Sequence, residues 1–148
     1  VHYEISSASL HDHPFFVCYN ELNPSGLRKV CHTGISLLHL SSGDTLFSEF
    51  EEPTCPRMFY VQEGSLRYEQ EDKHIVTSIG PHTWMCEATL WTTWRHCGTL
   101  QATSDTQIVV LKAAELQRIF TLFPTAHAST YGEQFVLWLN MKRMFGLS

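Results

Sequence analysis

The sequence predicts a mainly β fold with flanking helices: an antiparallel, jelly-roll-like β-roll with an N-terminal helical lead-in and two C-terminal helices. Three observations carry this prediction. Short β-type runs follow one another from residue 35 to residue 111, and turn residues separate them. No long helical pattern interrupts these runs, whereas two helical patterns follow them. Strands that are short and regularly spaced form a sandwich or roll in preference to a parallel α/β sheet.

Residues 1–30 are predicted to be an N-terminal arm and helical lead-in. Residues 1–13 are polar and have no hydrophobic periodicity, so we assign them no element. From Pro14 onward, apolar positions indicate short helical pieces. The segment Asn23-Pro24-Ser25-Gly26 breaks them, because its residue types favour a turn.

Residues 31–112 are predicted to form the β-roll, with a short internal pocket helix. The predicted strands are residues 35–40, 45–50, 58–62, 66–70, 74–79 and 106–111. Residues 58–61 are apolar in succession, as in a strand buried on both faces, whereas residues 66–70 alternate. We expect these two strands to pair through a turn at Gly64.

Residues 113–148 are predicted to hold the two C-terminal helices. The first begins near Ala113 and ends before Pro124. Its apolar stripe is Leu116, Ile119, Phe120 and Phe123, at the spacing of one helical face. The second runs from about residue 126 to residue 145.

The composition indicates one folded domain, since 43% of the 148 residues are hydrophobic and only 17% are charged. The net charge of -5 excludes a nucleic-acid-binding surface, which requires clustered Lys and Arg. The longest apolar run, residues 135–139, is far shorter than the roughly 20 residues of a membrane-spanning helix.

Five cysteines form no C-x-x-C pair, which favours free thiols in a reducing compartment and hence a cytoplasmic location. The cytosolic face of a membrane protein fits the same observation. Because the chain starts with Val1, we expect it to be a segment of a larger parent polypeptide or protein complex.

Five short motifs follow one another along the chain. They are LSSGDTLF at residues 40–47, FYVQEGSL at 59–66, IGPHTW at 79–84, EATL at 87–90 and TLQA at 99–102. Each is weak alone, but their order resembles the cyclic nucleotide-binding domain family of kinase regulatory subunits, bacterial transcription regulators and ion channels. The segment with Trp91 and Trp94 is similar to divergent channel-associated versions from protists.

The resemblance implies a ligand site for cAMP or cGMP. In the family, backbone N–H groups at a short helix N-terminus and an arginine hold the phosphate, and a glutamate takes the ribose 2'-hydroxyl. The site residues carried over to this chain are Cys86, Glu87, Ala88, Arg95, His96, Gly98 and Thr99. Of these, Glu87 matches the glutamate, Cys86 replaces a glycine, and His96 stands where the arginine is expected.

These departures predict a degenerate phosphate pocket. Arg95 lies one residue early, so its side chain points to the other face of a regular strand unless a bulge resets the register. His96 holds a phosphate less firmly than a bidentate guanidinium. The sequence therefore predicts a non-enzymatic regulatory or docking module without a cofactor. The alternative is a functional cAMP or cGMP sensor of a channel or kinase.

Three further hypotheses concern particular residues. A cupin-type metal enzyme would use some of the nine histidines, but the only His-x-His, His11-Asp12-His13, precedes the roll. Cys86 and His96 could form a nucleophilic pair, since a helix N-terminus can lower a thiol pKa. Trp91 and Trp94 either stack on a base or fill the pocket.

The last hypothesis concerns the second C-terminal helix. Its apolar positions are Phe135, Trp138, Leu139 and Met141. This face either packs back on the roll or binds a partner, and packing on the roll is the favoured reading.

Overall fold

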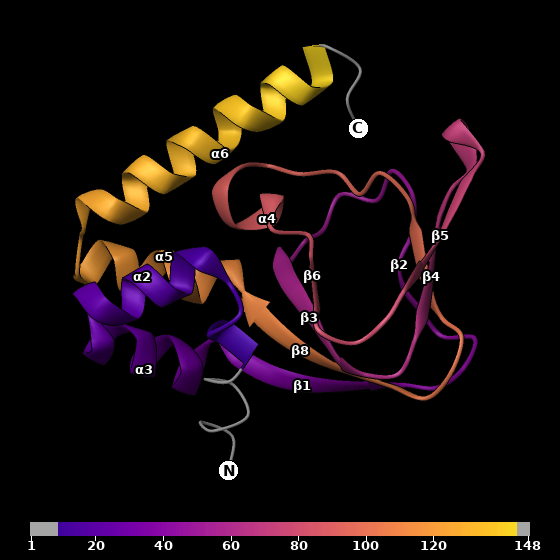
Figure 1. The fold of residues 1–148 in the computed structure, drawn as a ribbon, viewed down its shortest axis with the longest axis horizontal. Helices are drawn as coiled ribbons and strands as arrows, with labels where there is room; N and C mark the ends of the chain where they lie inside the picture. The colour runs from indigo at the N-terminus through magenta and orange to yellow at the C-terminus, as the bar shows by residue number, and fades with distance from the viewer. Residues whose placement is uncertain (1–8, 145–148) are drawn as a thin grey trace.

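The computed structural model describes residues 9–144, and Figure 1 shows its arrangement. In chain order the elements are α2 (Pro14–Leu22), α3 (Pro24–Thr33), β1 (Ile35–Leu40), β2 (Thr45–Phe47), β3 (Arg57–Glu63), β4 (Leu66–Gln70), the 3-10 turn η1 (Glu71–Lys73), β5 (Ile75–Ile79), β6 (Thr83–Met85), α4 (Ala88–Trp91), β7 (Thr99–Ala102), β8 (Thr106–Lys112), α5 (Ala113–Leu122) and α6 (Ala126–Met144). Within this range the strands form two four-stranded antiparallel sheets, ordered β1-β8-β3-β6 and β2-β7-β4-β5. The predicted β-roll with flanking helices is confirmed.

The two sheets face each other around an apolar core. Its buried members are Phe47, Phe59, Val61, Leu66, Leu100, Ile108 and Val110. Strand β3 contributes Phe59 and Val61 to this core, while Met58 on its opposite face packs into the helical layer. The prediction that residues 58–61 are buried on both faces is therefore confirmed, because alternate side chains of one strand serve two cores.

Helices α2, α3 and α5 pack into a layer beside the roll, with α6 extending across the molecule above α4 (Figure 1). Side chains cap the first two helices: the His13 imidazole accepts from the Phe15 amide, and Asn23 accepts from the Gly26 amide. Leu10 is fully buried in this layer. Residues 9–13 were assigned no element from the sequence, yet Leu10 belongs to the core and Ser9 and His13 are buried; residues 1–8 lie outside the described range.

Strands β3 and β4 do not pair through Gly64, so that expectation is wrong. Strand β3 pairs with β8 on one side and β6 on the other, and β4 pairs with β5 and β7. Both edges of β3 are thus occupied, and the chain crosses to the other sheet after Gly64. This residue has a φ of 98°, and a Cβ there would lie 2.5 Å from the Asp105 carbonyl oxygen, so only glycine fits the crossing.

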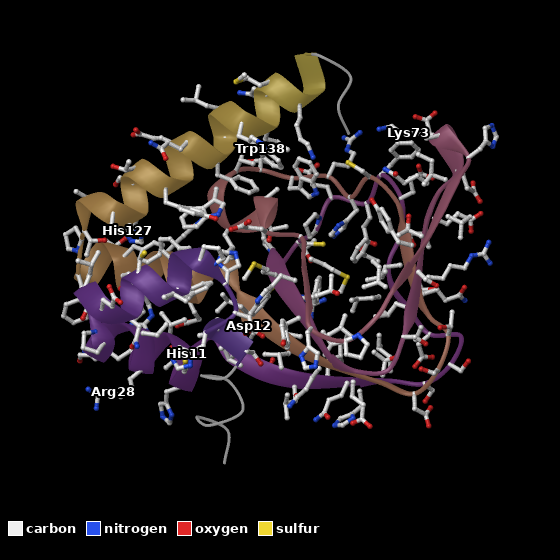
Figure 2. All side chains as sticks on the ribbon, viewed as in Figure 1. His11, Asp12, Arg28, Lys73, His127 and Trp138 are labelled. Atoms are coloured by element: carbon white, nitrogen blue, oxygen red, sulfur yellow. The ribbon has the colours of Figure 1, made fainter. Side chains whose placement is uncertain are left out.

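Other boundaries differ modestly from the sequence analysis. The first strand has the predicted bounds, residues 35–40, but helix α3 continues to Thr33, and β2 stops at Phe47 instead of residue 50 because the following residues turn away from the sheet. The turn η1 joins β4 to β5, and Figure 2 shows Lys73 at the tip of this hairpin. No helix within residues 9–144 has the length and hydropathy to cross a membrane.

Candidate functional site

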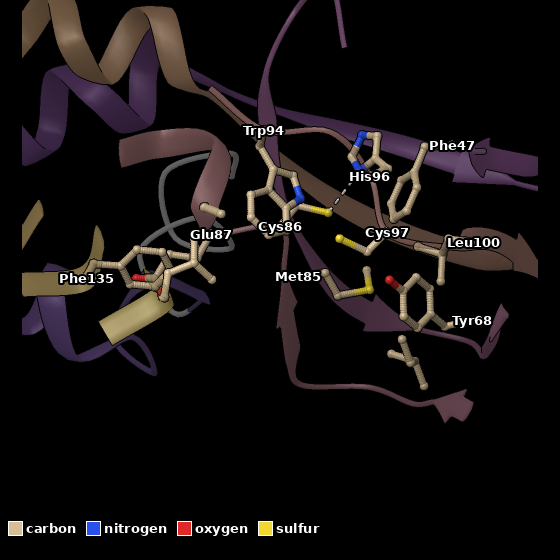
Figure 3. Close-up of a pocket in the computed structure, with 13 residues that line it drawn as sticks. Phe47, Tyr68, Met85, Cys86, Glu87, Trp94, His96, Cys97, Leu100 and Phe135 are labelled. Atoms are coloured by element: carbon tan, nitrogen blue, oxygen red, sulfur yellow. Dashed lines mark hydrogen bonds between the residues drawn. The ribbon is translucent and has the colours of Figure 1, made fainter. Parts of the chain in front are cut away.

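A cavity of about 300 Å³ lies between the inner face of the roll, α4 and α6 (Figure 3). It is lined by Phe47, Tyr68, Ile79, Met85, Cys86, Glu87, Ala88, Trp94, His96, Cys97, Leu100, Phe135 and Leu139. Most of these side chains are apolar or aromatic, and none is Lys or Arg. The cavity therefore offers no permanent cation to an anionic ligand.

Cys86 lies between β6 and α4 in the left-handed backbone region, with a φ of 65°. Glycine adopts this conformation without the steric cost that a Cβ carries, which explains why the resembling family favours glycine here. The Cys86 thiol lies 3.9 Å from the Nδ1 atom of His96. Burial, and to a smaller extent the nearby Cys97, raise the pKa of the Cys86 thiol to about 12. The expectation of a lowered thiol pKa is therefore wrong, and a protonated thiol disfavours the nucleophilic pair.

His96 is buried, with 5% of its surface exposed, and its ring stacks on Phe47 with 3.8 Å between centroids. Its backbone is held on both sides: the Phe50 amide donates to the His96 carbonyl, and the His96 amide donates to the Glu51 carbonyl. Burial is the largest effect on the pKa of His96 and lowers it. The charge of Glu51 raises this pKa, and the charge of Arg57 lowers it further. The imidazole is therefore neutral near pH 7.

Glu87 begins α4 and accepts two hydrogen bonds from distant elements. His13 Nε2 lies 2.7 Å from Glu87 Oε1, and the Tyr131 hydroxyl on α6 lies 2.8 Å from the same oxygen. Because His13 Nδ1 already accepts from the Phe15 amide, the proton on Nε2 faces Glu87. We call Glu87, His13 and Tyr131 the carboxylate clamp.

The carboxylate clamp shifts the pKa of Glu87 and the pKa of Tyr131. Burial alone raises the pKa of Glu87, but the hydrogen bond and charge of His13 and the hydrogen bond from Tyr131 outweigh it and lower the pKa below its usual value. Burial and the bond to Glu87 raise the pKa of Tyr131 well above its usual range. Glu87 is thus an ionised acceptor whose partners come from both ends of the described chain.

The predicted site residues divide into three groups. Cys86, Glu87, Ala88 and His96 line the cavity. Arg95 is exposed and borders a neighbouring surface hollow, whose lining shares His96 and Cys97 with the cavity. The segment before β7 is irregular, yet Arg95 is not among the residues that line the cavity.

Gly98 and Thr99 do not line the cavity but support it. The Thr99 hydroxyl accepts from the Glu49 amide at 2.9 Å, which ties β7 to the segment after β2. A Cβ on Gly98 would lie 2.5 Å from the Tyr68 ring and 2.8 Å from the Glu69 carbonyl oxygen. Gly98 therefore lets the Tyr68 ring approach the backbone closely.

Trp91 and Trp94 lie in different parts of the structure. Trp94 lines the cavity, as one of the two readings of the sequence expects. Trp91 instead lies in the helical layer, against Phe15, Phe120 and Tyr131. Only Trp94 is therefore placed to contact a ligand in this cavity.

The histidines of the N-terminal segment do not converge on a metal site. His11 is exposed, Asp12 accepts from the Tyr60 hydroxyl, and His13 belongs to the carboxylate clamp. Figure 2 shows His11 and Asp12 beside the helical layer. Within residues 9–144, no group of three or more His, Cys, Asp or Glu side chains is arranged to hold a metal ion.

The family model described as the cyclic nucleotide-binding domain matches residues 37–122, which is more than half of the chain. The chain belongs to this family. Its domains are regulatory, not catalytic. No curated protein is similar enough in sequence to be matched.

Several solved structures share the fold of this cyclic nucleotide-binding domain. The N-terminal domain of a transcriptional regulator from Streptomyces coelicolor A3(2) is 21% identical, with a TM-score of 0.67 over 92% of this chain and 94% of that one. The sensor domain of the transcriptional regulator DNR from Pseudomonas aeruginosa is 16% identical, with a TM-score of 0.69 over 95% and 92%. At these identities the likeness shows the fold alone.

An ion-channel structure is similar as well. The C-linker and CNBHD of zELK channels is 15% identical, with a TM-score of 0.69. The match covers 85% of this chain and 61% of that one. The fold is therefore common to regulators with quite different attached domains.

Helix α6 closes one side of the cavity of this cyclic nucleotide-binding domain. Phe135 and Leu139 line the cavity, whereas Trp138 and Met141 are 51% and 58% exposed. The favoured reading of the sequence, in which this helix packs back on the domain, thus holds for two of the four apolar positions. Sequence reasoning did not identify Phe135 or Leu139 as cavity residues, because only the chain fold brings α6 over α4.

Replacing Gly98 with alanine tests the support beneath Tyr68. The new Cβ would meet both an aromatic ring and backbone, so we expect the free energy of unfolding to fall by about 1–3 kcal/mol. Gly80 is the matched control, since a Cβ there meets nothing within 4 Å. Urea denaturation of both variants measures the difference; equal stability of the two would contradict this role of Gly98.

Proposed function

We propose that this cyclic nucleotide-binding domain is a non-enzymatic regulatory or docking module whose cavity does not hold a cyclic phosphate. The observation that carries the proposal is the state of the polar groups around the cavity. Its lining has no Lys or Arg, its histidine is neutral, and its glutamate is bound to His13 and Tyr131.

The cavity lacks the groups that would bind the phosphate of a cyclic nucleotide. A phosphate is held by bidentate guanidinium contacts or by backbone N–H groups at a helix N-terminus. In this chain Arg95 faces the surface hollow, and Cys86 places a side chain where the family's glycine leaves the backbone open. An anion entering the cavity would lose its hydration without gaining a cation, which is unfavourable.

The glutamate that would bind the ribose already has hydrogen-bond partners within the chain. Glu87 is the residue that resembles the family's ribose-binding glutamate, but both neighbours of its Oε1 atom are supplied by the chain. A ribose hydroxyl at Oε1 would have to compete with Tyr131, and displacing Tyr131 would also break a contact that holds α6. The position of α6 is therefore set by contacts within the chain instead of by a nucleotide.

This arrangement supports a role in a larger cytoplasmic polypeptide or complex. A domain with α6 fixed against α4 presents a constant surface to an attached or neighbouring partner. The alternative, a functional cAMP or cGMP sensor, requires the carboxylate clamp to open and a cation to enter the cavity.

Titration calorimetry with cAMP and with cGMP tests the proposal. We expect no saturable heat up to about 1 mM nucleotide, and no nucleotide-dependent rise in melting temperature. A dissociation constant below about 10 μM for either nucleotide would contradict the proposal and favour the sensor. Circular dichroism on the same sample shows that the protein is folded.

A further inference from the structure

We propose that the cavity binds a neutral, largely apolar molecule of about two rings that carries one hydrogen-bonding group directed at the Tyr68 hydroxyl. The inference rests on the proposed function, because it requires a cavity that rejects a cyclic phosphate. Size, polarity and one unoccupied hydrogen-bonding group each point to this ligand class.

The size of the cavity fits a two-ring ligand. An apolar cavity of about 150 Å³ in a protein interior binds benzene. The cavity here measures about 300 Å³, at the lower end of the range for small-molecule sites. It has room for roughly twice the volume of one aromatic ring.

The polarity of the cavity favours a neutral ligand. The thiol of Cys86 stays protonated, His96 stays uncharged, and the Oε1 atom of Glu87 already accepts from His13 and Tyr131. The remaining lining is dominated by aliphatic, thioether and aromatic groups, with Met85, Leu100 and Trp94 on different sides. Apolar ligand surface would be stabilised here, whereas a charge would not.

Tyr68 supplies the polar contact. Its ring packs closely against Gly98, and its hydroxyl points into the cavity (Figure 3). That hydroxyl makes no hydrogen bond to another residue of the described range 9–144. Burial raises the pKa of Tyr68 to about 12, so the group keeps its proton and can either donate or accept.

Helix α6 provides the side of the cavity through which a ligand would be sensed. Phe135 and Leu139 contribute the α6 part of the lining, so an occupant would touch both the roll and this helix. Leu137, two residues before Leu139, is 63% exposed and does not line the cavity. The pair offers a matched test of whether a bound molecule reaches α6.

The test compares two fluorescent probes with the same ring system. 2-Naphthol is neutral and has one O–H group, whereas 6-hydroxynaphthalene-2-sulfonate adds a sulfonate to the same two rings. We expect the neutral probe to saturate one site and to bind at least about tenfold more tightly than the sulfonate. Equal or tighter binding of the sulfonate, or no saturable binding of the neutral probe, would overturn the inference.

Variants then locate the probe. Tyr68→Phe should weaken the neutral probe about three- to tenfold, as expected for one lost hydrogen bond. Leu139→Glu should weaken it at least about tenfold by placing a carboxylate at the cavity, whereas Leu137→Glu should leave it within about twofold. Equal affinities for the two glutamate variants would contradict binding at this site.

Competition separates this inference from the proposed function. Displacement of the neutral probe by micromolar cAMP or cGMP would contradict the proposed function, and with it the inference that depends on it. If neither the neutral probe nor either nucleotide binds, the apolar-ligand inference is contradicted and the proposed function is not.

Discussion

Replacing Glu87 with alanine is expected to lower the free energy of unfolding by about 2–4 kcal/mol, because it leaves two donors of the carboxylate clamp without an acceptor. The His13 side chain is only 6% exposed, so water cannot easily replace the lost carboxylate. Tyr131 loses the bond that ties α6 to α4. Urea denaturation near pH 7 measures the change.

Glu133→Ala is the matched control for this prediction. Glu133 is an exposed glutamate on α6, and we expect its replacement to change stability by less than about 0.5 kcal/mol. The loss of stability in Glu87→Gln should lie between those of Glu87→Ala and Glu133→Ala, since an amide oxygen can still accept one hydrogen bond. A Glu87→Ala variant as stable as Glu133→Ala would show that the carboxylate clamp does not hold the fold.

The effect of Glu87 should also depend on pH. Its pKa is lowered in the folded protein, so its stabilising contribution is complete above the unfolded value of 4.5 and is lost as the pH falls through the folded value. The stability difference between wild type and Glu87→Gln should therefore be largest near pH 7 and shrink below about pH 4.5. A difference that stays constant down to about pH 3.5 would contradict this linkage.

Replacing Phe15 with alanine should produce the largest loss of stability, about 3–5 kcal/mol. Phe15 is 1% exposed, and its ring contacts aromatic rings from four helices. These rings are Phe16 and Tyr19 of α2, Trp91 of α4, Phe120 of α5, and His127 and Tyr131 of α6. The cavity left in the helical layer cannot be filled by any one neighbour without moving another.

Val17→Ala provides the comparison on the same helix. Val17 is 39% exposed, so its truncation should cost less than about 1 kcal/mol. Chemical denaturation followed by tryptophan fluorescence reports both variants, since Trp91 contacts Phe15. A Phe15→Ala loss no greater than that of Val17→Ala would contradict the role of Phe15 as the centre of the helical layer.

The elements of the fold were largely predictable because their signals are local. The run at residues 106–111 is apolar and bounded by turn residues, and it forms β8. Helix α5 carries a regular stripe and stops before Pro124, as its sequence predicts. The partners of β3 were not predictable in the same way, since the turn at Gly64 indicates a reversal but does not specify which sheet receives the next strand.

The candidate site was predictable only in part. The motif around Glu87 places Cys86, Glu87 and Ala88 together, and the structure puts all three on the cavity wall. His13 and Tyr131 were missed because they reach Glu87 from 74 and 44 residues away along the chain. The one local signal for His13 is its position immediately before Pro14, which suits a helix N-cap.

The aromatic wall of the cavity was missed for a related reason. Tyr68 lies on the same face of its strand as the buried Leu66, so the alternation places it inward, but its contact with Gly98 comes from a segment 30 residues away along the chain. Phe135 and Leu139 belong to a helix without a distinct apolar stripe, since its large side chains are divided between the cavity and the surface. Such features follow from tertiary packing and not from local sequence.

We expect this cyclic nucleotide-binding domain to exclude a cyclic phosphate from its cavity although it has the fold of the family. Methyl NMR of isoleucine and leucine side chains tests it at the site itself, because Ile79, Leu100 and Leu139 line the cavity. We predict that the methyl chemical shifts of these three residues stay unchanged when cAMP or cGMP is added to about 1 mM. Saturable shifts of the three signals at micromolar nucleotide would contradict it.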